Sequence, residues 1–238
     1  MFEIIPLAMR IESHGMGPAP IIILVILLVI GLAIFSYLQE KKRREALQAI
    51  ALQLGFSFSP DKDHSFADQY GFLNHMDDGS NRYACNIMQG TANDGSSCSI
   101  FDYHYETHST DSKGRRTTHH HYFSIFTLIL PKSFPELEIK PEGLFSKLGQ
   151  ALGFDDIDFE SMEFSKRYQV KSDDKKFAYD FCNAQMIDCL LRQQDLIIEV
   201  ESNVLAITFE GRLALDAIIP GYERLLLIRS LMPQYLFS

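Results

Sequence analysis

Five of the eight histidines in this 238-residue chain lie within 18 consecutive positions. They are His104, His108, His119, His120 and His121. Imidazole is a frequent metal ligand, and it gains or loses a proton near neutral pH. A cluster of this kind therefore suggests a metal site, a proton-responsive surface, or simply a polar surface.

Three alternating segments surround these histidines, and turn residues separate them. The segments are NRYACNIMQG, CSIFDYHYETH and TTHHHYFSIFTLILP. Asp94-Gly95 lies in the first connection and Ser112-Lys113-Gly114 in the second, and Gly and Asp tolerate the positive φ of hairpin turns. The sequence predicts three antiparallel strands that carry the histidines.

The two turns also predict a register. With Asp94-Gly95 and Ser112-Lys113 at the turn centres, Cys85, His104 and His121 fall in one row across the sheet. The next row holds Tyr83, Glu106 and His119. Opposed residues have Cβ atoms about 5 Å apart, so a zinc or iron site with Cys85, His104, His119 and His121 as ligands is one hypothesis.

The metal site depends on this register. A register slip of one residue turns every side chain to the opposite face of the sheet, and the sequence identifies no partner that would orient the ligands. Two other interpretations of the histidines therefore stay open, and a pH or metal sensor is one of them. The default interpretation is a polar hairpin without a cofactor.

No other pattern in the chain indicates an enzyme. Glycine-rich phosphate loops, GxSxG and HExxH are all absent. The four cysteines show no CxxC spacing, which favours free thiols. The acidic stretch from Asp155 to Glu163 lacks the ligand spacing of a calcium loop. We assign no catalytic residue and favour a non-enzymatic function, with a metal-dependent hydrolase as the alternative.

An uncharged apolar segment, APIIILVILLVIGLAIFSY, predicts a transmembrane helix over residues 19–39. About 20 helical residues span the hydrocarbon layer of a bilayer. Lys41, Lys42, Arg43 and Arg44 follow it, and cations near a membrane end favour the cytoplasmic side. We predict a single-pass protein of the bacterial inner membrane with its N-terminus outside and its main domain in the cytoplasm.

A cleaved signal peptide is the alternative interpretation of this segment. Gly31 and Ala33 give it a small-residue motif. The long tail before the apolar run and the basic cluster after it argue against cleavage and translocation. The four cations are also candidates to contact anionic lipid headgroups.

The charge of the chain argues against nucleic acid as a partner. The formal net charge is −9, and five basic and three acidic residues lie up to Arg44, which leaves 17 basic and 28 acidic residues, net −11, in the remainder. Such a domain repels phosphate backbones. Lys113, Arg115 and Arg116 lie at a predicted loop tip, where lipid or an acidic partner could contact them.

The order of elements predicts an α+β protein: an N-terminal transmembrane helix, then a mainly antiparallel sheet with flanking helices. We divide it into a tail (1–18), the membrane helix (19–39), a basic juxtamembrane helix (40–55) and a soluble domain (56–238), with two subdomains split near 153 as the alternative.

Four local predictions complete this fold. DLIIEVESNVLAITFEG predicts a hairpin around Ser202-Asn203 that exposes Glu199, Glu201 and Thr208. DDKKFAYDFCNAQMIDCLLRQ predicts one helix, and GYERLLLIRSLM predicts another that begins at Pro220. An amphipathic helix is predicted over residues 143–152.

Several segments resemble a family of bacterial membrane-associated proteins of unknown function. They are KKRREALQAIALQLGFSFSP, FDYHYET, LEIKPEGLFSKLGQALGFDDIDFES and EFSKRYQVKSDDKKFAYDF. The resemblance covers about residues 45–210. It implies this architecture and a bacterial origin, and it transfers no catalytic residue. Together with the anchor, it favours a membrane-anchored binding or scaffolding module whose partners are the bilayer and a protein, or a second copy of the chain.

Overall fold

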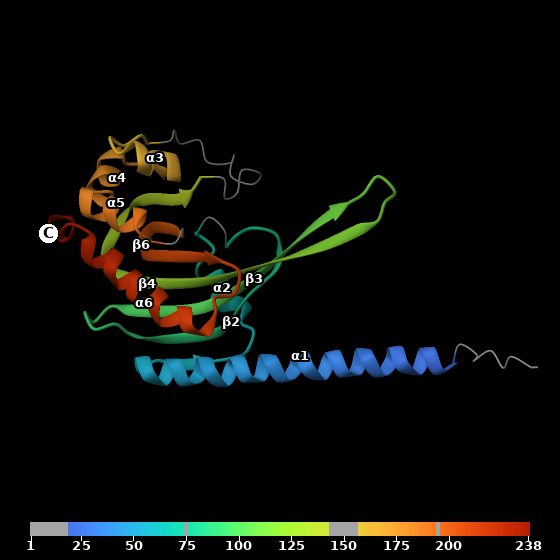
Figure 1. The fold of residues 1–238 in the computed structure, drawn as a ribbon. Coiled ribbons are helices and arrows are strands. Elements are labelled where there is room, and N and C mark those ends of the chain that lie inside the picture. Colours follow the sequence, from blue (N-terminus) through green and yellow to red (C-terminus); the bar gives the residue numbers. More distant parts are fainter. Residues whose placement is uncertain (1–18, 74–75, 143–156, 194–195) are drawn as a thin grey trace, which may run out of the picture. The chain divides into compact units, whose positions relative to one another are not determined.

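The computed structural model describes residues 19–73, 76–142, 157–193 and 196–238. It confirms the predicted fold class, because a long apolar N-terminal helix precedes an antiparallel sheet with flanking helices (Figure 1). The helices are α1 (Ala19–Leu54), α2 (His64–Asp68), α3 (Met162–Arg167), α4 (Lys175–Phe181), α5 (Ala184–Leu191) and α6 (Leu215–Leu231), and a 3-10 turn covers Gln234–Phe237. The strands are β1 (Ser57–Ser59), β2 (Ser80–Thr91), β3 (Ser97–Thr110), β4 (Arg116–Pro141), β5 (Tyr168–Ser172) and β6 (Ile197–Glu210).

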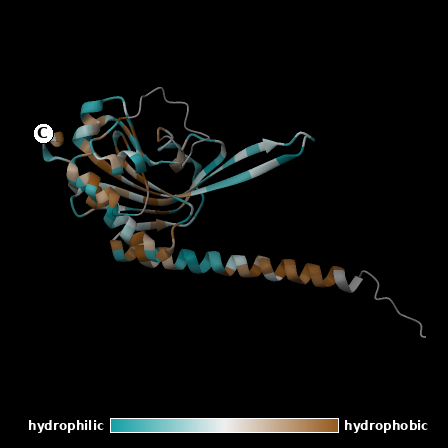
Figure 2. Ribbon diagram, turned by 45° about the horizontal axis from the view of Figure 1, so that its top comes forward, coloured by the Kyte–Doolittle hydropathy of each residue, from teal (hydrophilic) through white to brown (hydrophobic). Residues whose placement is uncertain are grey.

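Helix α1 contains the predicted membrane segment. By length and composition, its stretch from Ile22 is apolar enough to cross a bilayer. Figure 2 shows the hydrophobic part of this helix followed by a hydrophilic stretch. The chain divides into two compact units, Met1–Arg43 and Arg44–Ser238, so the last turns of α1 belong to the second unit, which we call the domain.

The long strand β4 organises the sheet. The order is β1-β2-β3-β4-β5, and β6 pairs with β4 on its other side. All pairs are antiparallel. The first half of β4 pairs with β3 and its end pairs with β5, while β6 runs along both parts. Strands β3 and β4 therefore hold a central position in the domain.

Apolar side chains form a core on each face of this sheet. On one face, Ile100, Phe126 and Ile207 join buried residues of α3 to α6 and of the last turns of α1. On the other face, Phe101 and Ile125 join the smaller core around α2. Alternate residues of one strand thus enter different cores, as the period of two requires.

One hairpin extends beyond both cores. Residues 107–121, which we call the arm, comprise the end of β3, a turn and the start of β4, and they project from the domain as a two-stranded ribbon (Figure 1). Within the described residues, β2 pairs with β3 only as far as Glu106, and β6 pairs with β4 only from Phe123. Each strand of the arm therefore has one free edge.

The hairpin predicted at Ser202-Asn203 does not form, because this segment is strand β6. It is one continuous strand, and Ser202 pairs with Phe134 of β4. The positive φ of Ser202, 53°, accompanies a register irregularity and not a chain reversal. Glu199 and Thr208, which we predicted to be exposed, are 4% and 2% exposed. The face of β6 that was predicted to meet solvent is buried too, because Val204 and Ala206 belong to the smaller core.

Two helix predictions are also corrected. The helix predicted from Asp173 onward is two helices, because Asn183 accepts hydrogen bonds from the backbone N–H groups of Gln185 and Met186 and so begins α5. Helix α6 begins at Leu215 and contains Pro220 in its interior. The predicted helix over 143–152, the possible split near 153 and the tail 1–18 lie outside the described residues.

Candidate metal centre

The histidines lie in a different register from the one predicted from the turns. His104 pairs with Tyr122 of β4 and Tyr83 of β2, whereas Cys85 pairs with Asp102. The row predicted to join Cys85, His104 and His121 therefore does not form. Glu106 pairs with His120, the histidine that the sequence prediction left out.

Turn length explains the change between β3 and β4. Asp111 N–H donates to the Arg115 carbonyl at 3.0 Å, so three residues form the loop, not two. Gly114 has φ +78°, which suits the left-handed residue that ends a three-residue hairpin loop. One additional loop residue shifts the register by one and turns His119 and His121 to the α2 face of the sheet.

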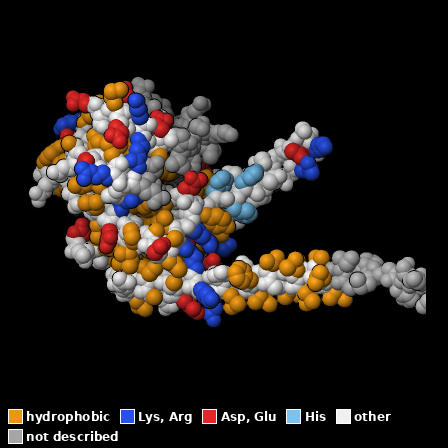
Figure 3. Space-filling view, viewed as in Figure 1, with side chains coloured by type: hydrophobic (Ala, Val, Ile, Leu, Met, Phe, Trp, Pro, Cys, Tyr) orange, Lys and Arg blue, Asp and Glu red, His pale blue; other side chains and the backbone are white. Residues whose placement is uncertain are grey.

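The structure instead gathers His104, Glu106 and His120 on the α6 face at the root of the arm. We call these three residues the histidine–glutamate cluster; one ligand atom from each lies within 4.8 Å of the others. His104 Nε2 lies 3.1 Å from His120 Nδ1, which lies 3.4 Å from Glu106 Oε1. Figure 3 shows histidine side chains at the place where the arm leaves the domain.

A hydrogen bond between two histidine rings lies at the centre of this cluster. His104 Nδ1–H donates to the backbone carbonyl of Asn81 at 3.3 Å, so Nε2 of neutral His104 carries a lone pair. In the His120 tautomer that carries hydrogen on Nδ1, this group donates to that lone pair and lies close to the Glu106 carboxylate. Lone pairs of His104 and Glu106 therefore converge on His120 Nδ1. If the hydrogen of neutral His120 lies on Nε2 instead, all three residues offer a lone pair to one cation.

Asn81 positions two members of the cluster. Its carbonyl orients His104, and its Nδ2 donates to Glu106 Oε1 at 2.7 Å. It has φ +51°, a conformation uncommon outside glycine, at a register irregularity between Ser80 and Tyr83. The side-chain bond to Asn81 is the main cause that holds the pKa of Glu106 below its usual value.

Burial keeps His104 neutral. It is 2% exposed and stacks on Tyr83 with ring centroids 4.5 Å apart, while Tyr122 lies on it at 4.8 Å. Desolvation is the largest cause that lowers the pKa of His104, and the nearby His120 and Lys62 lower it further. The bond to Asn81 and the charge of Glu106 oppose this shift. Neutral imidazole is the form that binds a metal.

The other predicted ligands have different partners. His121 bonds Thr107 Oγ1 at 2.9 Å and stacks on Tyr105, and His119 bonds Ser109 Oγ at 2.9 Å. Cys85 is buried beside Asn86, whose Nδ2 lies 3.9 Å from its sulfur. The two histidine contacts link the strands of the arm. All three residues lie outside the histidine–glutamate cluster.

The structure supports the prediction of free thiols. Cys85, Cys98, Cys182 and Cys189 are all free, and the first three are buried. Desolvation raises the pKa of Cys98 to about 12, so its reactive thiolate is disfavoured at neutral pH.

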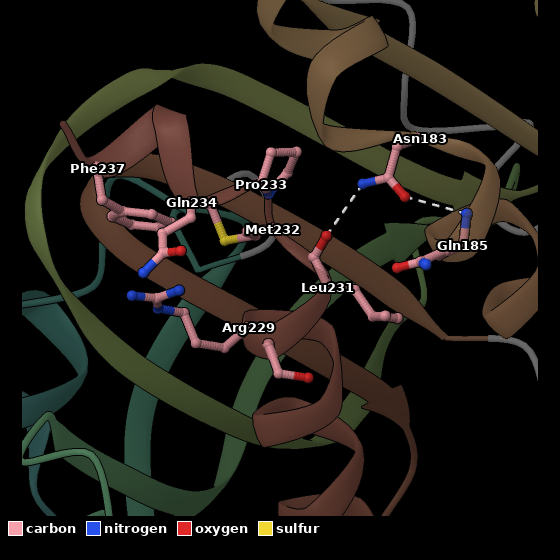
Figure 4. A pocket seen from close by; sticks show the side chains of 9 residues that line it. Asn183, Gln185, Arg229, Leu231, Met232, Pro233, Gln234 and Phe237 are labelled. Carbon is pink, nitrogen blue, oxygen red and sulfur yellow. Dashed lines mark hydrogen bonds between the residues drawn. The ribbon is translucent and has the colours of Figure 1, made fainter.

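A surface pocket lies between the start of α5 and the end of the chain (Figure 4). Asn183 Nδ2 donates to the Leu231 carbonyl at 3.0 Å, and Arg229 lies over the Phe237 ring at 3.8 Å. These contacts fasten α5 and the C-terminal turn to α6. We assign this pocket a structural role.

Comparisons with known proteins bear on the fold. No family model matches the chain, and no curated protein matches it. A solved structure, the crystal structure of the mycobacterial trehalose monomycolate transport factor A, TtfA, is similar with a TM-score of 0.60 and 14% sequence identity. The similarity covers 79% of this chain and 93% of that one. At this identity the likeness establishes a shared fold, and function must be argued from the residues.

Proposed function

We propose that this chain is a membrane-anchored binding module, and that the arm of its domain recognises a partner protein at the bacterial inner membrane. The arm is the observation that supports this proposal. Strand edges carry unpaired N–H and C=O groups that can pair with another chain. An extended partner segment added to such an edge is a recurring mode of recognition.

The arm is built to remain extended. Polar side chains bond across its two strands, as in the pairs His119–Ser109 and His121–Thr107. At the tip, the Asp111 carboxylate accepts from the backbone N–H groups of Lys113 and Arg115, each at 2.9 Å. A rigid ribbon loses little conformational entropy when it binds.

The charge of the tip favours an acidic partner surface. Lys113, Arg115 and Arg116 lie there against the single carboxylate of Asp111, in a chain whose formal net charge is −9. Complementary charge at a binding surface accelerates association and fixes orientation. We therefore propose that the partner presents an extended strand with acidic residues beside it.

The direction of the anchor belongs to the same proposal. Lys41 to Arg44 follow the apolar stretch of α1, and cations at this end of a membrane helix favour a cytoplasmic domain, which we propose here. The fold is shared with a protein named as a transport factor. By that analogy, we propose that the partner belongs to a membrane transport assembly.

Site-specific photocrosslinking in intact cells tests this function. A photoreactive amino acid at Thr118, in the arm, is expected to give a defined crosslinked protein, whereas the same group at exposed Glu223 of α6 is not. Lys113→Glu with Arg116→Glu should reduce the arm crosslink at least fivefold.

Two results would contradict the proposal. One is equal crosslinking from both positions, and the other is crosslinking from Thr118 that the charge reversal leaves unchanged. A reporter fused after Ser238 checks the orientation, because its activity must be that of a cytoplasmic domain.

A further inference from the structure

The histidine–glutamate cluster has the donor set of a transition-metal site. It offers two imidazole nitrogens and one carboxylate oxygen from His104, His120 and Glu106. Two histidines and one glutamate form a zinc-binding set, and two histidines with a carboxylate also suit ferrous iron. Calcium and magnesium prefer oxygen ligands, so two imidazoles disfavour them.

Two of the three distances between ligand atoms match tetrahedral coordination, and the third pair lies within 4.8 Å. Ligand atoms at 2.0–2.1 Å from a tetrahedral zinc ion lie about 3.4 Å apart. His104 Nε2 and His120 Nδ1 are 3.1 Å apart, and His120 Nδ1 and Glu106 Oε1 are 3.4 Å apart. An ion therefore requires only small movements of side chains that already converge.

Partners outside the cluster hold two of the three ligands. The Asn81 carbonyl fixes the His104 ring so that Nε2 faces the cluster, and the Asn81 amide holds the Glu106 carboxylate. Metal-binding histidines characteristically donate their second N–H to a carbonyl or carboxylate. This support distinguishes the cluster from His119 and His121, whose ring nitrogens bond hydroxyl groups.

Solvent can reach the cluster from one side. The His120 side chain is 52% exposed and that of Glu106 is 17% exposed, while His104 is buried. Three protein ligands leave one tetrahedral position for water, the arrangement of an open zinc site.

We propose that His104 Nε2, His120 Nδ1 and Glu106 Oε1 bind a zinc ion at the root of the arm. His120 binds the ion as the neutral tautomer whose hydrogen is on the other ring nitrogen, Nε2, so that the lone pair of Nδ1 faces the ion. The ion links β3 to β4 where the arm leaves the domain. This site follows from its own geometry and does not require that the arm have a partner. Failure of the crosslinking experiment would leave it unaffected.

Zinc binding by the full-length chain in detergent micelles tests the site. The protein carries no histidine tag, is stripped with a chelator, and is titrated with Zn²⁺ against a chromophoric competitor. The wild type should bind one zinc ion per chain with high affinity. His120→Ala and Glu106→Gln should each weaken binding at least tenfold.

Two histidines in the same strand supply matched controls. His119→Ala and His121→Ala remove neighbouring imidazoles on the other face of the sheet, and they should retain wild-type affinity. Asn81→Gly keeps a residue that adopts positive φ but removes the amide, so affinity should fall about 10- to 100-fold. Circular dichroism confirms that each variant is folded.

Thermal unfolding gives a second measurement. The unfolding midpoint of the wild type should rise with zinc concentration, because a ligand that binds the folded state stabilises it. His120→Ala should show no such rise. Zinc binding that is equal in wild type and His120→Ala, or lost equally in His119→Ala, would overturn the proposal.

Discussion

Glu201 is a residue whose charge opposes folding. It lies in β6 beside the register irregularity at Ser202. Partial burial is the largest cause that raises its pKa, and the nearby carboxylates of Glu136 and Asp173 raise it further. The folded protein therefore holds a proton on Glu201 more tightly than the unfolded chain does.

This shift predicts a pH-dependent effect of Glu201→Gln. Because the folded pKa is raised, the favourable contribution of protonated Glu201 is complete below its unfolded pKa, about 4.5, and is lost as pH rises through the folded pKa. The variant should unfold roughly 1–3 °C higher than wild type at pH 7.

The two proteins should have nearly the same stability at pH 4, and calorimetry at both pH values checks this pattern. Glu223→Gln, at an exposed position of α6, controls for the loss of one negative charge. A lower melting temperature for Glu201→Gln at pH 7 would contradict the interpretation.

Single residues also explain why the candidate site was only partly predictable. The sequence indicated that the histidines converge on adjacent strands, and it included His104. It missed His120 because the loop between β3 and β4 has three residues and not two. It misplaced Cys85 because β2 contains register irregularities that no periodicity reveals. Asn81 and Asn86 both adopt positive φ where the β2–β3 register shifts.

At the scale of elements, helix α6 packs unusually close to the sheet. Gly221 is buried in this helix, and a Cβ atom there would lie 2.7 Å from the Phe126 ring, which is itself completely buried. Glycine costs about 1 kcal/mol relative to alanine within a helix. Close contact with Phe126 explains why a residue of poor helix propensity occupies this position.

Gly221→Ala should therefore destabilise the domain despite its better helix propensity. Displacement of Phe126 should cost about 1–3 kcal/mol, which outweighs the gain in propensity. Urea unfolding measures the difference. Ser230→Ala, at an exposed position of the same helix, should change stability by less than about 0.5 kcal/mol. A stabilised Gly221→Ala protein would show that α6 packs less closely than described.

Elements with strong local signals were predicted, and those set by tertiary contacts were not. Gly95 and Gly114 turn the chain with positive φ, so both hairpins were found from sequence. Ser202 also has positive φ, but β4 pairs on both sides of it and keeps β6 continuous. Only contacts distant in sequence distinguish these two outcomes.

At the scale of the whole molecule, helix α1 combines an apolar stretch with last turns that pack in the core of the domain. The apolar stretch of α1 has the composition of a membrane span, and its last turns contribute Leu47 and Ala51, 1% and 0% exposed, to the larger core. Ile50 and Leu54 pack against the same core. The domain therefore begins within the helix, near Arg44, and not where the helix ends.

A pair of truncations tests this boundary. Residues 44–238 should fold cooperatively, because every described residue of the larger core lies in this segment. Residues 55–238 lack Leu47 and Ala51 and expose the apolar surface that they cover. Loss of one buried leucine alone typically costs 2–5 kcal/mol, so the shorter protein should be less stable by roughly 3 kcal/mol or more. Equal urea midpoints would mean that the last turns of α1 belong to the anchor alone.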